Sequence, residues 1–96
     1  MTRKKVYELL KKVPKDKVTT YKELADAAGI HQRAVAVYMK TNKDPVGVPC
    51  FRVISSDGSL GGYSGNKGVP EKIRLLEKNG IKIVNGKVDE KYIHRF

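Results

Sequence analysis

The chain has one cysteine, Cys50, and cysteine is the side chain with the strongest intrinsic nucleophilicity near neutral pH. Pro49 restricts the backbone just before it, and the Arg-Val-Ile run at residues 52–54 predicts a short buried strand just after it. A lone cysteine is also commonly a small, buried apolar residue. The residues around Cys50 are therefore needed to tell whether Cys50 is a nucleophile or a core residue.

Metal chemistry has little support in this sequence. A single cysteine excludes an intramolecular disulfide, and His31 and His94 are the only histidines beside it. Structural zinc sites use four cysteine or histidine ligands. We therefore expect no metal and no cofactor.

Length and charge indicate the kind of partner. The 96 residues suit one domain with one core, and 20 Lys and Arg against 10 Asp and Glu give a formal net charge of +10. A polyanion, above all nucleic acid, is the first partner to consider. An anionic membrane surface is the alternative, but the basic residues are spread along the chain and no helix combines a broad apolar face with aromatic anchors.

Targeting signals are not evident either. No apolar run approaches the roughly 20 residues of a membrane span, and residues 1–5 are too polar for the core of a signal peptide. We expect a cytoplasmic, monomeric protein without a membrane partner.

The first forty residues predict three helices. Apolar residues at 6, 9, 10 and 13 repeat at helical spacing and stop at Pro14. Thr20 and Glu23 form a capping box for a second helix, which Gly29 ends, and a third helix follows over about 31–40. The last two match a helix-turn-helix, although two packed helices with a solvated basic face would give the same pattern.

The third predicted helix carries the candidate DNA contacts. Gln32 and Arg33 stand near its start, and Ala34 and Ala36 lie in a stretch with small side chains and almost no charge. Such a surface can approach DNA closely.

The second half of the chain predicts loops, a helix and hairpins. Residues 41–49 are too rich in Pro and Gly for regular structure, and residues 52–54 can pair with residues near Leu60 across the Asp57-Gly58 turn. The glycine-rich stretch 60–68 lacks the phosphate-loop pattern. A last helix with Pro70 at its first position ends at 79–80, and residues 81–88 predict a hairpin with an Asn-Gly turn.

These residues together carry a family resemblance. The pattern Pro49-Cys50-x-Arg52-Val53, the Gly-Tyr-Ser-Gly at 62–65 and the preceding helix-turn-helix resemble the DNA-binding domain of the 6-O-alkylguanine-DNA alkyltransferases. The resemblance covers essentially the whole chain, without the family's usual N-terminal domain. It implies a mostly α fold with small β hairpins, winged helix-turn-helix-like. It also implies a single domain, 1–96, with four parts: a helix-turn-helix at about 20–40, an active-site loop at about 41–54, the Tyr-Ser-Gly loop at 61–68, and a C-terminal helix and hairpin at 69–96.

The resemblance implies direct repair of alkylated DNA. Members bind duplex DNA, rotate an alkylated guanine out of the stack and transfer its alkyl group irreversibly to a cysteine. Cys50 matches the acceptor, Arg33 the arginine that fills the gap left by the base, and Asn42 the residue that bridges helix-turn-helix and active-site loop. Tyr21 resembles a phosphate contact.

The resemblance also implies a guanine pocket. Its wall would comprise Met39, Pro45, Tyr63 and Ser64. The Tyr63 hydroxyl and the Ser64 backbone N–H would neutralise the leaving guanine, and the Cys50 and Val53 carbonyls would read its amine.

Each match has a plain alternative. Asn42 could end a helix, Arg33 could be a solvated cation, and Tyr63-Ser64 could be a polar turn. Their joint spacing favours the family.

Two positions depart from the family. Phe51 stands where members have a histidine that relays the cysteine proton toward a glutamate, and Glu77 matches that glutamate, although an ion pair with Arg74 would also explain it. We therefore expect slow rather than absent transfer, and Phe51→His is expected to speed it. Val37 is bulkier than the glycine often found on that part of the DNA-facing helix.

Two other classes of function remain open. Alkyltransferase-like sensors bind alkylated DNA without chemistry, but they replace the cysteine. A helix-turn-helix regulator would leave the Pro-Cys-x-Arg-Val segment and the Tyr-Ser-Gly loop unexplained. The retained Cys50 favours the methyltransferase.

Overall fold

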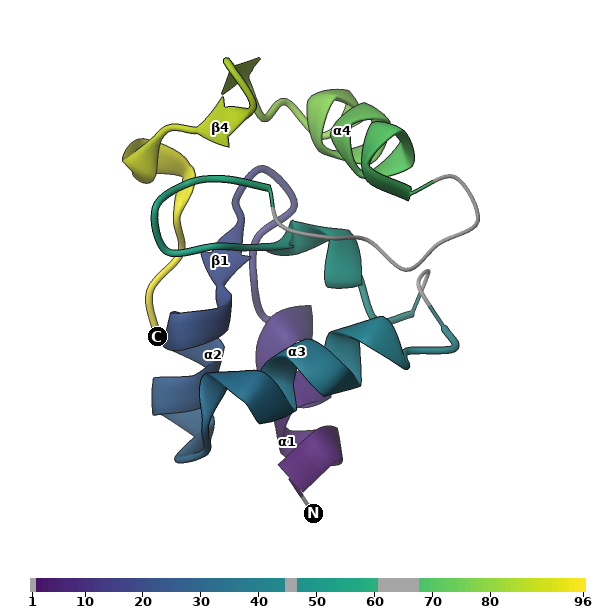
Figure 1. Ribbon diagram of the computed structural model, residues 1–96, viewed down its shortest axis with the longest axis vertical. Helices are drawn as coiled ribbons and strands as arrows, with labels where there is room; N and C mark the ends of the chain where they lie inside the picture. Colours follow the sequence, from purple (N-terminus) through teal and green to yellow (C-terminus); the bar gives the residue numbers. More distant parts are fainter. Residues whose placement is uncertain (1, 45–46, 61–67) are drawn as a thin grey trace.

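Three helices form one end of the molecule (Figure 1). The computed structural model describes residues 2–44, 47–60 and 68–96. Helix α1, Thr2–Lys11, buries Val6 and Leu10 completely and ends before Pro14, as its apolar spacing predicts. Its buried face packs against the two helices that follow.

Helices α2, Tyr21–Ala28, and α3, Gln32–Lys40, form the predicted helix-turn-helix. The Thr20 hydroxyl accepts from Glu23 N–H at 3.0 Å, and Gly29 ends α2 with φ +72. His31 caps α3 by accepting from Arg33 N–H through Nδ1. The Glu23 carboxylate accepts from Arg95, so the C-terminal tail is tied to α2.

Strand β2, Val53–Ile54, pairs with β1, Thr19–Thr20, in parallel. The expected pairing of β2 with residues near Leu60 is wrong for the described residues: Ser55 N–H donates to Ser59 across a tight turn instead. Both strands are buried, and parallel pairing requires a long crossover, which α2 and α3 supply.

The C-terminal part is a helix followed by a hairpin. Helix α4, Gly68–Lys78, begins two residues before Pro70 and is followed by Gly80 at φ +88. Strands β3, Ile83–Val84, and β4, Lys87–Val88, pair antiparallel across the predicted turn. Asn85 and Gly86 both have positive φ there. A short 3-10 helix, η2, covers Glu90–Tyr92.

The core has two clusters of buried residues. The first joins α1, α2 and α3 and includes Val35, Met39 and Cys50; the second lies between α4, β2 and the hairpin and includes Phe51 and Leu76. The short 3-10 helix η1, Cys50–Arg52, stands between them. Consecutive residues of η1 thus belong to different cores.

The architecture agrees with the expected fold class, a mostly helical domain with small β elements and a winged helix-turn-helix-like order. Within residues 2–44, 47–60 and 68–96, no helix has the length and apolar character to cross a membrane. The cytoplasmic location, the monomeric state and the functional division of the domain stay predictions.

Candidate active site and nucleic-acid interface

Cys50 opens η1 and its side chain faces the first core cluster. The residue is 6% exposed, next to buried Pro49. Its N–H donates to Val48 O at 2.7 Å, and its carbonyl accepts from Val53 N–H. The backbone on both sides of the thiol is therefore fixed by hydrogen bonds.

The Asn42 side chain connects the end of α3 to the segment before Cys50. Its Nδ2 donates to Val48 O at 2.9 Å, while its Oδ1 accepts from Asp44 N–H at 3.0 Å. The backbone N–H of Asn42 donates to Met39 O. This geometry suits the bridging role expected for Asn42, and it places the end of α3 beside the cysteine segment.

Tyr21 begins α2 and packs half-buried against the first cluster. Burial raises the pKa of its phenol above the ordinary value, and negative charge on Cys50 raises it further. The phenol therefore remains a neutral hydrogen-bond donor at physiological pH, and Tyr21 packs against the cluster that contains Cys50.

The outer face of α3 is small and weakly charged. Gln32, Arg33 and Ala36 are exposed, Ala34 is half-buried, and Val37 is 52% exposed. Val35 and Met39 turn inward and hold the helix on the first cluster. Arg33 is thus exposed to solvent in the first turn of a helix whose outer face carries mostly small side chains.

Phe51 lies on the other side of η1 from the thiol cluster. It is 7% exposed among apolar residues of the second cluster, including Leu76 and Ile81, and the Arg52 guanidinium lies 5.1 Å from the centre of its ring. At the family's histidine position this chain therefore has a core residue.

Glu77 has a solvated side chain on α4. Arg74 bonds to Glu71, so the alternative explanation of Glu77 as the partner of Arg74 is wrong. The structure does not assemble a relay from Phe51 and Glu77, because the ring carries no transferable proton and the carboxylate faces solvent.

A buried lysine was missed by the sequence analysis. Lys72 in α4 is 1% exposed, and its Nζ donates to Val53 O and to Leu60 O, each at 2.6 Å. Burial lowers the pKa of Lys72 to about 8, and negative charge on Cys50 opposes that shift. The available signal was register: Lys72 stands four residues before buried Leu76, on the inward face of α4.

Three expected site residues, Pro45, Tyr63 and Ser64, lie outside the described residues. Among the described ones, the structure brings Tyr21, Met39, Asn42, Cys50 and Val53 to one region, and it leaves Glu77 in solvent.

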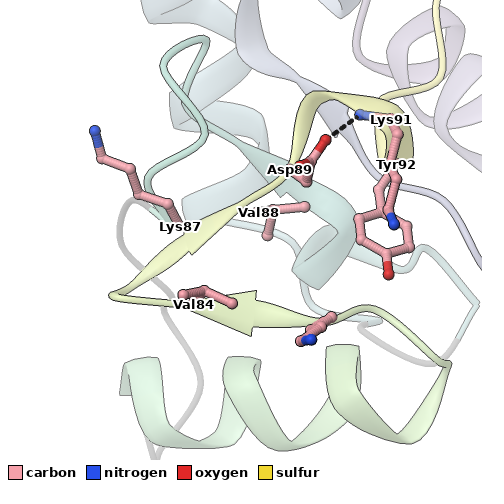
Figure 2. Close-up of a pocket in the computed structure, with 7 residues that line it drawn as sticks. Val84, Lys87, Val88, Asp89, Lys91 and Tyr92 are labelled. Atoms are coloured by element: carbon pink, nitrogen blue, oxygen red, sulfur yellow. Dashed lines mark hydrogen bonds between the residues drawn. The ribbon is translucent and has the colours of Figure 1, made fainter.

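A separate hollow of about 360 Å³ lies beside the hairpin and η2 (Figure 2). Figure 2 shows Asp89 accepting from the backbone N–H of Lys91, the bond that caps η2. Lys82, Lys87 and Tyr92 also line the hollow. None of its lining residues belongs to the expected site, so the hollow adds positive surface rather than a guanine pocket.

The sequence matches the family model described as 6-O-methylguanine DNA methyltransferase, DNA binding domain, over residues 1–81. The chain belongs to this family. The match includes Cys50, Asn42 and the helix-turn-helix.

Individual proteins agree with this assignment. A bifunctional methyltransferase/endonuclease of Picrophilus torridus is 48% identical over 88 residues, which are 90% of this chain and 29% of that protein. The O6-methylguanine-DNA methyltransferase of Pyrococcus kodakaraensis is 48% identical with a TM-score of 0.75, covering 82% of this chain and 46% of that one. S. pombe Atl1, in complex with damaged DNA containing O6-carboxymethylguanine, is 28% identical with a TM-score of 0.86, covering 99% and 95%.

The chain spans less than a third of the Picrophilus protein and about half of the Pyrococcus enzyme. It spans nearly all of Atl1. The family and the fold are therefore shown.

Proposed function

We propose that this domain repairs alkylated DNA directly, by transferring the alkyl group of 6-O-alkylguanine to Cys50 in a single turnover. The observation that carries the proposal is the retained Cys50, fixed at the junction of α3 and β2 with its backbone tied to Asn42 through Val48.

The reaction balances without a cofactor. The Cys50 thiolate attacks the alkyl carbon, the new S–C bond forms as the C–O6 bond breaks, and the electron pair remains on guanine, which then takes a proton. The Tyr63 hydroxyl and the Ser64 N–H are proposed to stabilise the charge that develops on guanine. The thioether product is stable, so each protein molecule reacts once.

Guanine selection is assigned to the remaining site residues. Met39 and Pro45 are proposed to wall the pocket, and the carbonyls of Cys50 and Val53 to read the exocyclic amine. The position of Met39 in the first cluster, together with Cys50, supports the first assignment.

Binding to duplex DNA is assigned to the exposed face of α3. Ala34 and Ala36 allow close approach, Gln32 contacts the groove, and Arg33 fills the gap left by the extruded base. Tyr21 is proposed to contact a backbone phosphate. The similarity to Atl1, which was solved in complex with damaged DNA, supports DNA binding by this domain.

A sensor of alkylated DNA is the second candidate. The solvated Glu77 and the buried Phe51 favour it, because neither can activate a thiol, and so does the match along nearly the whole of Atl1. The retained Cys50 favours the enzyme. A helix-turn-helix regulator explains neither the cysteine nor its bridge.

Incubation with duplex DNA that contains one 6-O-methylguanine distinguishes these functions. We expect one methyl group on the Cys50 peptide by mass mapping, and no modification in Cys50→Ala, which should still bind the lesion. Unmodified Cys50 with lesion-selective binding would establish the sensor. Equal binding to damaged and undamaged duplex without transfer would contradict both.

A further inference from the structure

Arg3, in the first turn of α1, bonds to the residue that ends α3. Its Nη1 donates to the Tyr7 hydroxyl at 2.9 Å and to Thr41 Oγ1 at 3.0 Å. Its guanidinium also lies 4.6 Å from the centre of the Tyr38 ring, within the range of a cation–π contact. One side chain thus connects α1 with the end of α3, although Arg3 and Thr41 are 38 positions apart.

The Tyr7 and Thr41 hydroxyls extend this connection into the last turn of α3. The Tyr7 hydroxyl donates to Tyr38 O at 2.8 Å, and the Thr41 hydroxyl donates to Val37 O at 2.7 Å. The last four carbonyls of a helix lack an N–H partner within it, and positive charge is favourable at that end. Residues of α1 therefore cap α3 from outside, with the Arg3 charge at the favourable end.

Asn42 directly follows this cap and holds the cysteine segment. Its Nδ2 donates to Val48 O at 2.9 Å, and the Cys50 N–H donates to the same carbonyl at 2.7 Å. A hollow of about 580 Å³ lies beside this segment, lined by Arg3 and Tyr7 of α1 and by Asn42 and Val48. Because open space lies there, hydrogen bonds rather than packed side chains fix the segment on this side.

The spacing between α3 and Cys50 matters for the proposed function. Arg33, at the start of α3, is proposed to fill the gap left by the extruded guanine, while Cys50 takes the alkyl group of that guanine. The two side chains therefore act on one nucleotide. A displacement of about 1 Å in a reacting geometry can slow a reaction about 100-fold.

We propose that Arg3 is a positioning residue, which fixes α3 relative to Cys50 through Thr41 and Asn42. The inference rests on the proposed function in taking α3 as the DNA-facing helix and Cys50 as the alkyl acceptor. Arg3 itself need touch neither the guanine nor the thiol. Its planar guanidinium suits this role, because it bonds to two hydroxyls and contacts an aromatic ring at the same time.

Amide hydrogen exchange tests the connection without DNA. Arg3→Met keeps most of the side-chain length and removes the hydrogen bonds and the charge. The amides of Thr41, Asn42 and Cys50 should then exchange at least about tenfold faster, because local opening of this segment costs less. Lys4→Met, an equal loss of charge at an exposed neighbouring position, should leave their exchange unchanged. Equal protection in native protein and Arg3→Met would overturn the proposal.

Single-turnover transfer from duplex that contains 6-O-methylguanine measures the consequence for repair. The limiting rate at saturating protein should fall about tenfold in Arg3→Met and stay at the native value in Lys4→Met. Affinity for the duplex should change equally in the two variants, because each loses one positive charge.

Two further variants separate geometry from charge. Lysine keeps the charge but lacks the planar fork, so Arg3→Lys should bind duplex as native protein does and still transfer slowly. Tyr7→Phe removes only the hydroxyl between Arg3 and Tyr38 O, and it should also lower the limiting rate. A native rate in Arg3→Lys, or a loss of affinity alone in Arg3→Met, would make Arg3 a phosphate contact and overturn the proposal.

The two measurements fail separately. Arg3-dependent protection of the three amides, in a protein that transfers no methyl group, overturns only the proposed repair function. Methyl transfer at the same limiting rate in native protein and Arg3→Met overturns only the role of Arg3.

Discussion

Phe51 stands at the family's histidine position, next to Cys50, and so bears on how the Cys50 thiol is activated. Because its ring is packed among apolar side chains with Leu76 and Ile81, this position supports the second core rather than the thiol. An imidazole there would lie among apolar side chains and against the Arg52 guanidinium, which is a donor and offers no acceptor. The structure thus argues against the expectation that a histidine restores activity.

Phe51→His should therefore lower the free energy of unfolding by about 1–3 kcal/mol, the cost of a buried imidazole without partners. Methyl transfer near pH 7 should not become faster. Urea unfolding and single-turnover kinetics measure the two quantities. Phe51→Leu is the apolar control, and a His variant as stable as native protein with faster transfer would show that the relay can be rebuilt.

Lys72 should make stability depend on pH. Burial lowers its folded-state pKa from 10.5 to about 8, so between these values the unfolded chain holds a proton that the folded protein has released. Stability must then rise with pH in this window, by about 1.4 kcal/mol per pH unit at most, and be independent of this group well below pH 8.

Urea unfolding between about pH 7.5 and pH 9.5 checks this prediction. Tyr21, whose pKa is raised from 10.0, opposes the trend only at higher pH. Lys72→Met should lack the rise, and an identical slope in both proteins would show that Lys72 keeps its proton when folded.

At the scale of elements, local signals were enough for the helices and the hairpin. Each of these signals acts within a few residues: the apolar spacing, the Thr20 cap, Gly29 and the Asn-Gly turn. The structure has a helix or a hairpin at each position where the sequence shows such a signal. The β1–β2 pair could not be predicted this way, because two-residue strands show no alternation and their partners are 34 residues apart (Thr19 and Val53). Leu60 therefore seemed the nearer partner for β2.

In the candidate site too, some residues could be predicted from the sequence and others depend on the tertiary structure. The spacing of Asn42 and Cys50 could be matched to a family pattern, and both lie together in the fold. Lys72 was harder to find: its register places it on the inward face of α4, but a lysine in a basic chain is normally solvated. Its role depends on Val53 O and Leu60 O meeting beneath α4, which only the tertiary structure brings about.

The docking of the hairpin depends on Gly58. It has φ +89, its carbonyl accepts from Val88 N–H, and a Cβ would lie 2.7 Å from Val88 O. Gly58→Ala should therefore destabilise the protein by more than the approximately 1 kcal/mol of an unfavourable left-handed backbone. Gly80→Ala is the matched control, because Gly80 has φ +88 and open space around its Cβ position. Thermal or urea unfolding that finds equal losses would exclude the steric contact.

At the scale of the whole molecule, the formal charge of +10 should govern binding to undamaged duplex. Affinity is expected to fall at least about tenfold between roughly 50 and 200 mM salt, with little dependence on sequence, because phosphate contacts release counterions. Fluorescence anisotropy at several salt concentrations gives the slope. A flat salt dependence would mean that charge is not what holds the domain on DNA.

Arg33→Ala should behave differently from the loss of a simple phosphate contact. A side chain that fills the gap of an extruded base stabilises the flipped state, so repair should fall more than affinity for undamaged duplex. Lys40→Ala, at the other end of α3, is the control and should lower both about equally. If Arg33→Ala also lowers both equally, Arg33 is another phosphate contact.

The most direct test of the account is the stoichiometry of methyl transfer. Protein is mixed with an excess of duplex carrying 6-O-methylguanine, and repaired guanine is counted against protein as a function of time. We predict that repair stops at one guanine per protein molecule, with all of the methyl recovered on Cys50. Intact lesion at every time point, with Cys50 unmodified and the protein still bound selectively to the damaged duplex, would contradict the account.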